Sequence, residues 1–313
     1  MADAVHVEAC RSCGAPSPRP FLSLGVTPIA NALLAEADLA RSEPCFPLGV
    51  AFCESCTLVQ LTDVLPADVI FGQDYPYYSS FSDALLAHAR EHVEGLLATG
   101  RLGPGKRLVE VASNDGYLLA PAMEHGVDVL GIEPTPGPAA AARALGIPTR
   151  QVFFDLDAAR ELRAEHGPAD VIVANNVMAH VPDLNGFVAG FRALIADDGL
   201  ITIENPWVRD LVRHAEFDTI YHEHYCYFSC TAVDALMRRH GLSLNDIEYF
   251  PNLHGGTLRW HVGPRADRTE RAAAYLREEE ADGLTSFAAY GAFADRVDGI
   301  VTDLRALLAR LRS

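Results

Sequence analysis

Short apolar segments alternate with helical segments from residue 107 onward, and this alternation constrains the fold more than any other feature of the chain. Four segments have the length and composition of buried strands: 107–112 (RLVEVA), 128–133 (DVLGIE), 170–176 (DVIVANN) and 199–205 (GLITIEN). Helical patterns occupy 118–126, 136–146 and 156–166 between them. Strands that alternate with helices of this length predict an α/β fold with a doubly wound parallel sheet.

Polar side chains cluster where these strands are predicted to end, and ligands of such sheets bind beyond the carboxyl ends of the strands. Gly116 allows close approach of the backbone, and Glu133 follows Asp115 by 18 residues. That spacing suits a carboxylate that holds ribose hydroxyls. The predicted cofactor-binding residues are Ser113, Asn114, Asp115, Gly116, Glu133, Pro134, Asn175 and Asn176.

The first of these turns contains one glycine where a GxGxxG pattern would have three, so it would cradle a pyrophosphate poorly. A cofactor that contains adenosine without a diphosphate fits better, and S-adenosylmethionine (SAM) is such a cofactor. The alternative is a fold that binds sugar nucleotides and carries two ordinary acids at its strand ends.

Two Cys-x-x-Cys pairs, Cys10/Cys13 and Cys53/Cys56, lie in the N-terminal segment. Each pair can direct two thiolates at one ion, and the two pairs together complete the tetrahedral coordination that Zn²⁺ accepts. Redox-active pairs are the alternative, but two copies without a thioredoxin-like βαβ context favour a metal. Four thiolate ligands leave no open position for a catalytic water, so the sequence predicts a structural zinc site.

The formal net charge of −17 and the isoelectric point near 5.0 argue against nucleic acid as a partner, because binding to phosphate backbones needs basic surfaces. No segment has the roughly 20 uninterrupted apolar residues of a membrane span, and no basic N-terminal region precedes an apolar run. The sequence therefore predicts a cytoplasmic protein without a membrane segment. In that reducing compartment, the seven cysteines do not indicate a disulfide framework.

The run Tyr221-His222-Glu223-His224-Tyr225 concentrates titratable side chains downstream of the predicted sheet. Because buried polar groups are costly unless they are paired, such a run indicates a surface or a cleft where its proton chemistry is used. One alternative is a solvated aromatic loop. Another is a metal site formed by His222 and His224 with Glu223, but the HExxH spacing is absent and no third ligand is identifiable.

Several segments share their order and residues with a known family: two CxxC pairs, DYPYYSSFS, VEVASNDGYLL, VLGIEP, VIVANNVMAHVPDLNGF, FDTIYHEHYCYFS and HGGTLRWHV. From Cys10 to about Val262, the chain resembles the SAM-dependent C-methyltransferases of deoxysugar biosynthesis, which act on nucleotide-linked 4-keto sugars. The resemblance implies a Rossmann-like methyltransferase core, SAM and structural zinc as cofactors, and a keto sugar that is linked to a nucleotide, expected to be dTDP.

His224 is the expected base, because a histidine with an ordinary pKa near 6.5 can accept a proton at cytoplasmic pH. Removal of a proton next to a ketone gives the enolate that methylation at C3 of a 4-keto sugar requires. The resemblance implies that Tyr221 and Glu223 lie at the active site, where they would orient the base or stabilise the oxyanion. It also implies that His180 faces the substrate, although a lone histidine is more often structural. Further expected contacts are Tyr75, which should reach the active site, and the substrate-binding residues Tyr77, Tyr78 and His222. For each of the tyrosines, the alternative is a structural packing contact at a domain interface.

The sequence divides into a zinc-binding domain (1–70), a methyltransferase core (71–263) and a helical C-terminal extension (264–313). The apolar spacing of the extension predicts a helix that needs a partner surface: the core, a further domain or a second subunit. Members of the resembled family continue into a further α/β unit that helps to hold the sugar nucleotide. For a chain that stops at Ser313, the expected explanations are truncation, a separate chain that supplies the unit, or a different substrate handle.

The leading functional hypothesis is a SAM-dependent C-methyltransferase that acts on a nucleotide-linked keto sugar. O- or N-methylation of a small metabolite is a second hypothesis from the same fold, and it would not need an acidic α-carbon. A third is a non-catalytic, zinc-stabilised module that binds a partner or a nucleotide.

Overall fold

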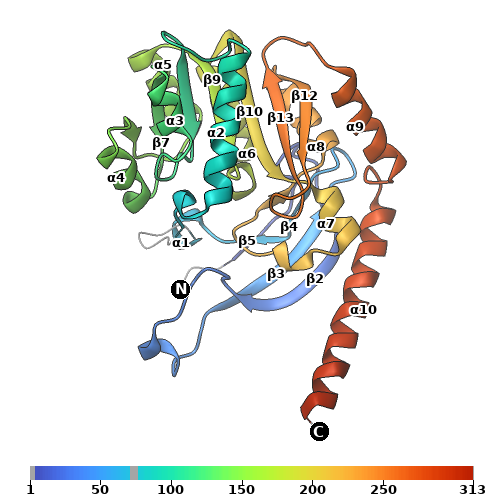
Figure 1. Cartoon of the computed structure of the whole chain (residues 1–313). Coiled ribbons are helices and arrows are strands. Elements are labelled where there is room, and N and C mark those ends of the chain that lie inside the picture. Colours follow the sequence, from blue (N-terminus) through green and yellow to red (C-terminus); the bar gives the residue numbers. More distant parts are fainter. Residues whose placement is uncertain (1–3, 71–76, 313) are drawn as a thin grey trace.

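The computed structural model describes residues 4–70 and 77–312, and a seven-stranded mixed sheet forms its centre (Figure 1). The order across this sheet is β12 (Ser243–Phe250), β13 (Thr257–Gly263), β10 (Ile195–Pro206), β9 (Ala169–Asn175), β6 (Arg107–Val111), β7 (Asp128–Ile132) and β8 (Thr149–Arg150). The five strands from β10 to β8 are parallel, whereas β13 runs antiparallel to both β10 and β12. The predicted parallel core is confirmed, and the antiparallel edge adds to it.

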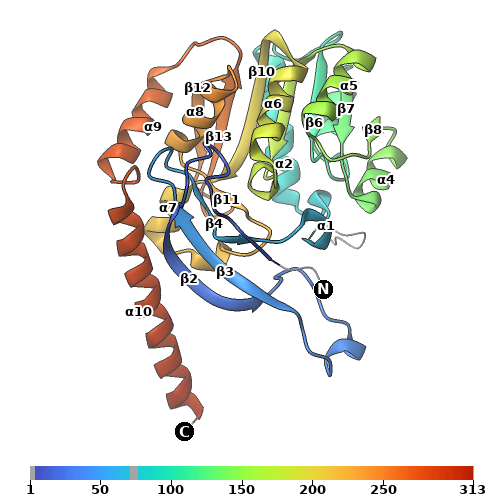
Figure 2. The same ribbon diagram turned by 180° about the vertical axis from the view of Figure 1, so that it is seen from behind.

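Helices cover both faces of the sheet, as expected for strands that are apolar along their whole length. One face carries α2 (Asp83–Ala98), α3 (Leu119–Glu124) and α4 (Pro136–Ala144), whose apolar side chains share a buried cluster with β6 and β9. The opposite face carries α5 (Leu156–His166), α6 (Leu184–Leu194) and α8 (Cys230–Arg239), as the view from behind shows (Figure 2). This two-sided cover leaves the carboxyl ends of the strands as the place for a ligand.

Side-chain caps fix where several of these helices begin. Asp155 accepts a hydrogen bond from the N–H of Ala158 at 2.8 Å at the start of α5, and Asp183 accepts one from Gly186 at 2.9 Å at the start of α6. Ser229 caps α8 in the same way. Such caps satisfy backbone donors that a helix leaves unpaired. They also set the position of the loops before α5 and α6, which border the carboxyl edge of the sheet.

A second, antiparallel sheet builds the N-terminal part of the molecule. Its order is β11 (Cys226–Tyr227), β4 (Val59–Leu61), β3 (Cys45–Phe52) and β2 (Arg19–Pro28), and a two-stranded sheet of β1 (Val5–His6) and β5 (Asp63–Val64) accompanies it. Strand β11 lies far along the chain, inside the predicted methyltransferase core. The segment that follows Tyr221–His224 is thus an edge strand of the N-terminal sheet.

The C-terminal extension is helical, as predicted. It comprises α9 (Glu270–Ala281) and the 26-residue α10 (Phe287–Arg312), and the short α7 (Val208–His214) lies beside α10. The first half of α10 buries Tyr290, Phe293 and Val297 against the N-terminal sheet and α7. Its second half extends away from the rest of the molecule (Figures 1 and 2).

The remaining elements are short: α1 (Ala67–Ile70) and the 3-10 turns η1 (Glu36–Asp38), η2 (Ser79–Phe81), η3 (Met178–His180) and η4 (Phe217–Thr219). Among the described residues, no helix combines the length and the apolar character needed to cross a membrane.

Candidate functional site

A cavity of about 770 Å³ opens at the carboxyl ends of β6, β7, β9 and β10. The strand ends form one wall, which we call the cofactor end. The opposite wall is called the reaction end. It is formed by residues 180–183 at the end of η3, by four residues at the end of η4 and just beyond it (Thr219, Tyr221, Glu223 and His224), and by Asn31 from the loop between β2 and β3. Most of the sequence-predicted site residues therefore converge on one cavity.

Glu133 is the central group of the cofactor end. The residue is 4% exposed, and its carboxylate accepts hydrogen bonds from the backbone N–H of Asn114 at 2.9 Å and of Thr135 at 2.8 Å, and also from the Thr135 hydroxyl. Burial raises the pKa of Glu133, and these donors offset part of that shift. The acid is thus held rigidly at the end of β7, as a ligand for hydroxyl groups would have to be.

Two amide oxygens at the cavity have no hydrogen-bond partner among the described residues. Asn175 at the end of β9 and Asn205 near the end of β10 line the cavity, and the Oδ1 atom of each is buried without a hydrogen-bond donor. Buried acceptors of this kind are costly unless a ligand or water satisfies them. SAM carries amino and hydroxyl donors, so the residues present fit this cofactor.

Asn114, Pro134 and Asn176 also line the cavity, whereas Ser113, Asp115 and Gly116 do not. The hydroxyl of Ser113 packs under Gly131 of β7, where a Cβ atom on the glycine would lie 2.5 Å from the Ser113 oxygen. Asp115 accepts a hydrogen bond from the N–H of Ser80 and, with Gly116, lines a separate, largely apolar groove. We therefore leave these three residues out of the proposed cofactor contacts.

The segment Val152–Asp155, which follows β8, lines the cavity but was not predicted from the sequence. Phe153 is 55% exposed and Phe154 is buried, so the pair presents aromatic surface beside Glu133. In the sequence, this segment could have been recognised only from two adjacent phenylalanines that precede a helix-capping aspartate. The strand before them has only two residues, too few to be recognised by periodicity.

The reaction end contains a tyrosine–histidine pair. The Nδ1 atom of His224 lies 3.0 Å from the carbonyl of Thr219, and its Nε2 atom lies 3.0 Å from the Tyr221 hydroxyl. A carbonyl only accepts, so the neutral ring carries its proton on Nδ1 and Nε2 accepts from Tyr221. Burial, with His180 nearby, lowers the pKa of His224 to about 3, and burial raises the pKa of Tyr221 to about 12. Both groups are neutral at physiological pH. The pKa of His224 therefore differs from the ordinary value near 6.5 that was expected from the sequence, although the neutral ring still offers a lone pair.

His180 and Glu223 lie beside this pair. The His180 ring donates from Nδ1 to the Glu223 carbonyl at 2.9 Å, and its centroid lies 4.8 Å from that of His224. Burial lowers the pKa of His180 to about 4. Burial also raises the pKa of Glu223, although its carboxylate accepts a hydrogen bond from Asn31 Nδ2 at 2.7 Å. Asn31 was not predicted from the sequence, because a single asparagine in a loop belongs to no recognisable motif.

Of the predicted substrate-binding residues, Tyr77 lines the cavity, whereas His222 and Tyr78 lie elsewhere. The ring of His222 faces the carbonyls of Phe46 and Pro47 at 3.3 and 3.2 Å, and the residue is 1% exposed, outside the cavity lining. Tyr77 lines the cavity, whereas Tyr78 stacks on Phe81 over the apolar groove. Tyr75 lies outside the described residues. We do not carry His222 and Tyr78 forward as substrate contacts.

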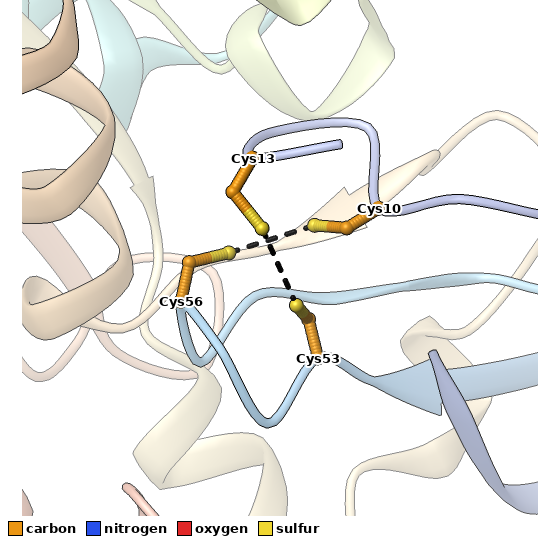
Figure 3. Close-up of side chains that lie close together, drawn as sticks. All are labelled: Cys10, Cys13, Cys53 and Cys56. Carbon is orange, nitrogen blue, oxygen red and sulfur yellow. Dashed lines mark hydrogen bonds between the residues drawn. The ribbon is translucent and has the colours of Figure 1, made fainter. Parts of the chain in front are cut away.

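The four predicted metal ligands converge at the N-terminal sheet (Figure 3). Their sulfur atoms lie within 4.8 Å of one another, with 3.5 Å between Cys10 and Cys56 and 3.6 Å between Cys13 and Cys53. Sulfur atoms that are bound to one tetrahedral Zn²⁺ at about 2.3 Å lie about 3.8 Å apart, so the cluster fits this ion. Among the described residues, no other group of three or more such ligands comes together, which leaves the histidine run without support as a metal site.

Both cysteine turns have the same backbone design. Gly14, with a φ of +73°, donates its N–H to the Cys10 carbonyl at 2.9 Å, and Thr57, with a φ of +63°, donates to Cys53 at 2.8 Å. The positive φ reverses the chain directly after each pair, so that both thiols of a turn point the same way. Threonine rarely adopts this conformation, which indicates a turn held by its surroundings.

Comparisons with known proteins agree with this geometry. Three family models match the chain: a zinc binding domain over residues 10–71, a methyltransferase domain over 84–246 and a C-methyltransferase C-terminal domain over 252–313. The curated C-methyltransferase NovU of Streptomyces niveus is 33% identical over 312 residues, which cover 98% of this chain and 74% of NovU.

Solved structures with a similar fold share little sequence. The magnesium protoporphyrin IX methyltransferase ChlM of Synechocystis is 13% identical, with a TM-score of 0.43 over 56% of this chain and 78% of that chain. The 1,6-didemethyltoxoflavin-N1-methyltransferase of Burkholderia thailandensis is 18% identical, with a TM-score of 0.42 over 58% and 79% of the two chains. The family models and the similarity to NovU place the chain in the family of SAM-dependent C-methyltransferases that carry an N-terminal zinc-binding domain.

Proposed function

We propose that this enzyme methylates the carbon next to the ketone of a nucleotide-linked 4-keto deoxysugar, at C3, through an enolate. The observation that carries the proposal is the neutral His224, whose Nε2 points at the Tyr221 hydroxyl inside the cavity. Methylation of a carbon needs a base and an oxyanion donor at one place, and this pair supplies both.

His224 is the proposed base. The hydrogen bond from Nδ1 to Thr219 fixes the tautomer that leaves the Nε2 lone pair on the Tyr221 side. When a ketone enters, the Tyr221 hydroxyl can turn from Nε2 to the ketone oxygen. This rotation of the hydroxyl exposes the Nε2 lone pair of His224 to the adjacent C–H of the substrate. It also directs the Tyr221 O–H donor at the ketone oxygen, where negative charge develops. His180 and Glu223 support this arrangement through their contacts with the same loop.

SAM, when bound, supplies a methyl group on a positively charged sulfur. The cavity is suited to this charge, because Glu133, Asp155, Asp183 and Glu223 line it. Among the described residues, the lining contains neither lysine nor arginine. A nucleotide diphosphate would therefore meet no cation here, so the proposal places the sugar ring in the cavity and the phosphates outside it. The dTDP carrier rests on the family resemblance alone.

Solvent exchange tests the chemistry directly. With the keto-sugar nucleotide and unreactive S-adenosylhomocysteine in D₂O, the wild-type enzyme should introduce deuterium at the α-carbon. His224→Asn should slow this exchange by about 100-fold or more, the usual range for loss of a general base. His222→Asn is the matched control: it lies in the same run but faces β3, and exchange should continue. Methylation on oxygen or nitrogen without any exchange would replace this proposal by O- or N-methylation, and absence of turnover would favour a binding module.

Two further expectations belong to this proposal. The outer half of α10 exposes an apolar stripe (Ile300, Leu304, Leu307, Leu308 and Leu311), which supports a partner surface on this helix, either a second subunit or another domain. A reducing compartment such as the cytoplasm is part of the proposal, because the four cysteine ligands must stay reduced to bind a metal.

A further inference from the structure

The first cysteine turn contacts the wall of the cavity directly. Arg11 lies within the turn Cys10–Cys13, and its guanidinium donates a hydrogen bond to the carbonyl of Pro182. The backbone carbonyl of Arg11 in turn accepts a hydrogen bond from Asn185 Nδ2 at 2.8 Å. Pro182 lines the cavity two residues after His180. One arginine thus bridges the metal-binding turn and the loop that carries a predicted catalytic histidine.

The same guanidinium contacts the second segment of the reaction end. Its central carbon lies 5.0 Å from the ring centroid of Tyr225, within the range of a cation–π interaction. Tyr225 directly follows His224, and its N–H donates to the carbonyl of Ala179 at 2.8 Å. Arg11 therefore touches both segments of the wall, one next to His180 and the other next to His224.

The backbone of the arginine is itself held in place. The N–H of Arg11 donates to Gln60 Oε1 of β4 at 2.9 Å, and the guanidinium of Arg239 in α8 donates to the hydroxyl of the adjacent Ser12. Arg11 is partly buried, whereas Arg41 of the same domain is exposed and its side chain forms an ion pair with Asp38, its only salt bridge within the described part of the chain. A side chain that is fixed at its base and contacts two segments at its tip can set the distance between them.

We propose that Arg11 is a positioning residue, through which the metal-binding turn sets the positions of His180 and His224. The inference depends on the proposed function only where activity is measured. It differs from a purely structural role for the N-terminal domain, because it assigns the coupling to one side chain and predicts a defect in the chemical step. Misplacement of a catalytic group by about 1 Å can cost about 100-fold in rate.

Three variants test this role in the zinc-loaded protein. Arg11→Met keeps the bulk and removes the donor and the charge, and it should lower kcat by about 10- to 100-fold with unchanged zinc content and unchanged affinity for S-adenosylhomocysteine. Arg11→Lys keeps a cation and a donor, so it should restore most of the rate. Arg41→Met, the matched surface control, should behave as wild type.

The ring signals of His180 and His224 give a second readout that does not need turnover. Long-range ¹H–¹⁵N spectra, assigned with His180→Gln and His224→Gln, should show both rings shifted in Arg11→Met and returned toward wild type in Arg11→Lys. Unmoved ring signals together with kcat within about twofold of wild type would overturn the inference, because misplacement should cost much more.

Asn185→Ala covers the case in which Arg11→Met does not fold. It removes the donor to the Arg11 carbonyl from the α6 side, outside the metal-binding turn, and should shift the same two rings. Failure of the proposed function would appear differently: wild-type protein would not methylate any keto sugar, while the ring signals would still report whether Arg11 positions the histidines. Unmoved rings in Asn185→Ala would then contradict the inference.

Discussion

The two ends of the cavity are built in different ways. The cofactor end consists of consecutive strand ends of one sheet, so its groups are positioned by the backbone of β6, β7, β9 and β10. The reaction end is assembled from three segments that are far apart in sequence: the loop that holds Asn31, residues 180–183 and residues 219–224. The first end depends on the topology of the sheet, and the second depends on how the N-terminal domain docks against it.

This difference predicts that the two ends can be separated by experiment. A change in the N-terminal domain should reach the reaction end through Arg11 and Asn31, and it should leave the cofactor end intact. A change at Glu133 should do the reverse.

Removal of a metal ligand should have the largest effect. Cys53→Ser, or treatment with a strong chelator, should lower methyl transfer by more than about 100-fold, because structural zinc contributes on the order of 10 kcal/mol to the folding of small metal-bound units. Affinity for S-adenosylhomocysteine should stay within about threefold, well under the tenfold that 1.4 kcal/mol represents. Turnover assays and calorimetric titration of the same preparation would measure both quantities.

Cys45→Ser is the matched control for this experiment. Cys45 is exposed and lies outside the cluster, so its replacement should leave zinc content and turnover unchanged. If Cys53→Ser weakened cofactor binding in parallel with methyl transfer, the two ends would form one unit, and the comparison would fail.

Most of the described residues that were predicted from the sequence line the cavity at both ends, but the two ends were recognised by different kinds of signal. Alternation of strands and helices locates strand ends, and Glu133 and Asn175 follow from that pattern alone. It does not give side-chain direction: Ala112, Asn114 and Asn176 have φ values of +57°, +50° and +52°, which turn the chain sharply at two strand ends. Such conformations are rare for residues other than glycine and are imposed by tertiary contacts. Asp115 was expected at the cavity but lines the separate apolar groove, because the pattern of strands and helices does not reveal these turns.

At the reaction end, sequence reasoning found Tyr221 and His224 through their density of titratable groups, supported by family resemblance. It gave no indication of Arg11 or Asn31, because their roles arise from contacts between segments that periodicity treats separately. His222 shows the same limit. It belongs to the same run, yet the pairing of β11 with β4 turns it toward β3. Alternation along the chain does not reveal which neighbour faces a cavity until the docking partner is known.

A change of pH should alter the free energy of unfolding by an intermediate amount, and the sign of the change should differ between the groups of the two ends. His180 and His224 have native pKa values of about 4 and about 3, below the usual value near 6.5. At a pH between the unfolded pKa near 6.5 and the native pKa of each histidine, the unfolded state binds more protons than the native state. The free energy of unfolding therefore falls as the pH decreases below about 6.5. The loss should be about 2 kcal/mol per histidine at pH 5. Glu133 acts in the opposite direction. Because its pKa is raised in the native state, the native state binds more protons than the unfolded state at a pH between the two pKa values. The contribution of Glu133 to the free energy of unfolding therefore decreases as the pH rises above the unfolded pKa.

Urea unfolding of wild type, His180→Gln and His224→Gln at pH 7 and pH 5 would measure this slope. Each substitution should flatten the dependence on pH, whereas His125→Gln, which replaces an exposed histidine, should leave it unchanged. Equal slopes in all four proteins would show that neither ring is buried in its neutral form as described.

The most direct test of the separation is calorimetric titration with S-adenosylhomocysteine of three zinc-loaded proteins: wild type, Glu133→Ala and His224→Asn. Loss of the Glu133 carboxylate should weaken binding by about tenfold or more, the order expected for a lost charged hydrogen-bonding partner. His224→Asn should bind as wild type does, even though its turnover is lost. Equal weakening by both variants would contradict two separable ends, and absence of binding heat in wild type would contradict the assignment of the cofactor to this cavity.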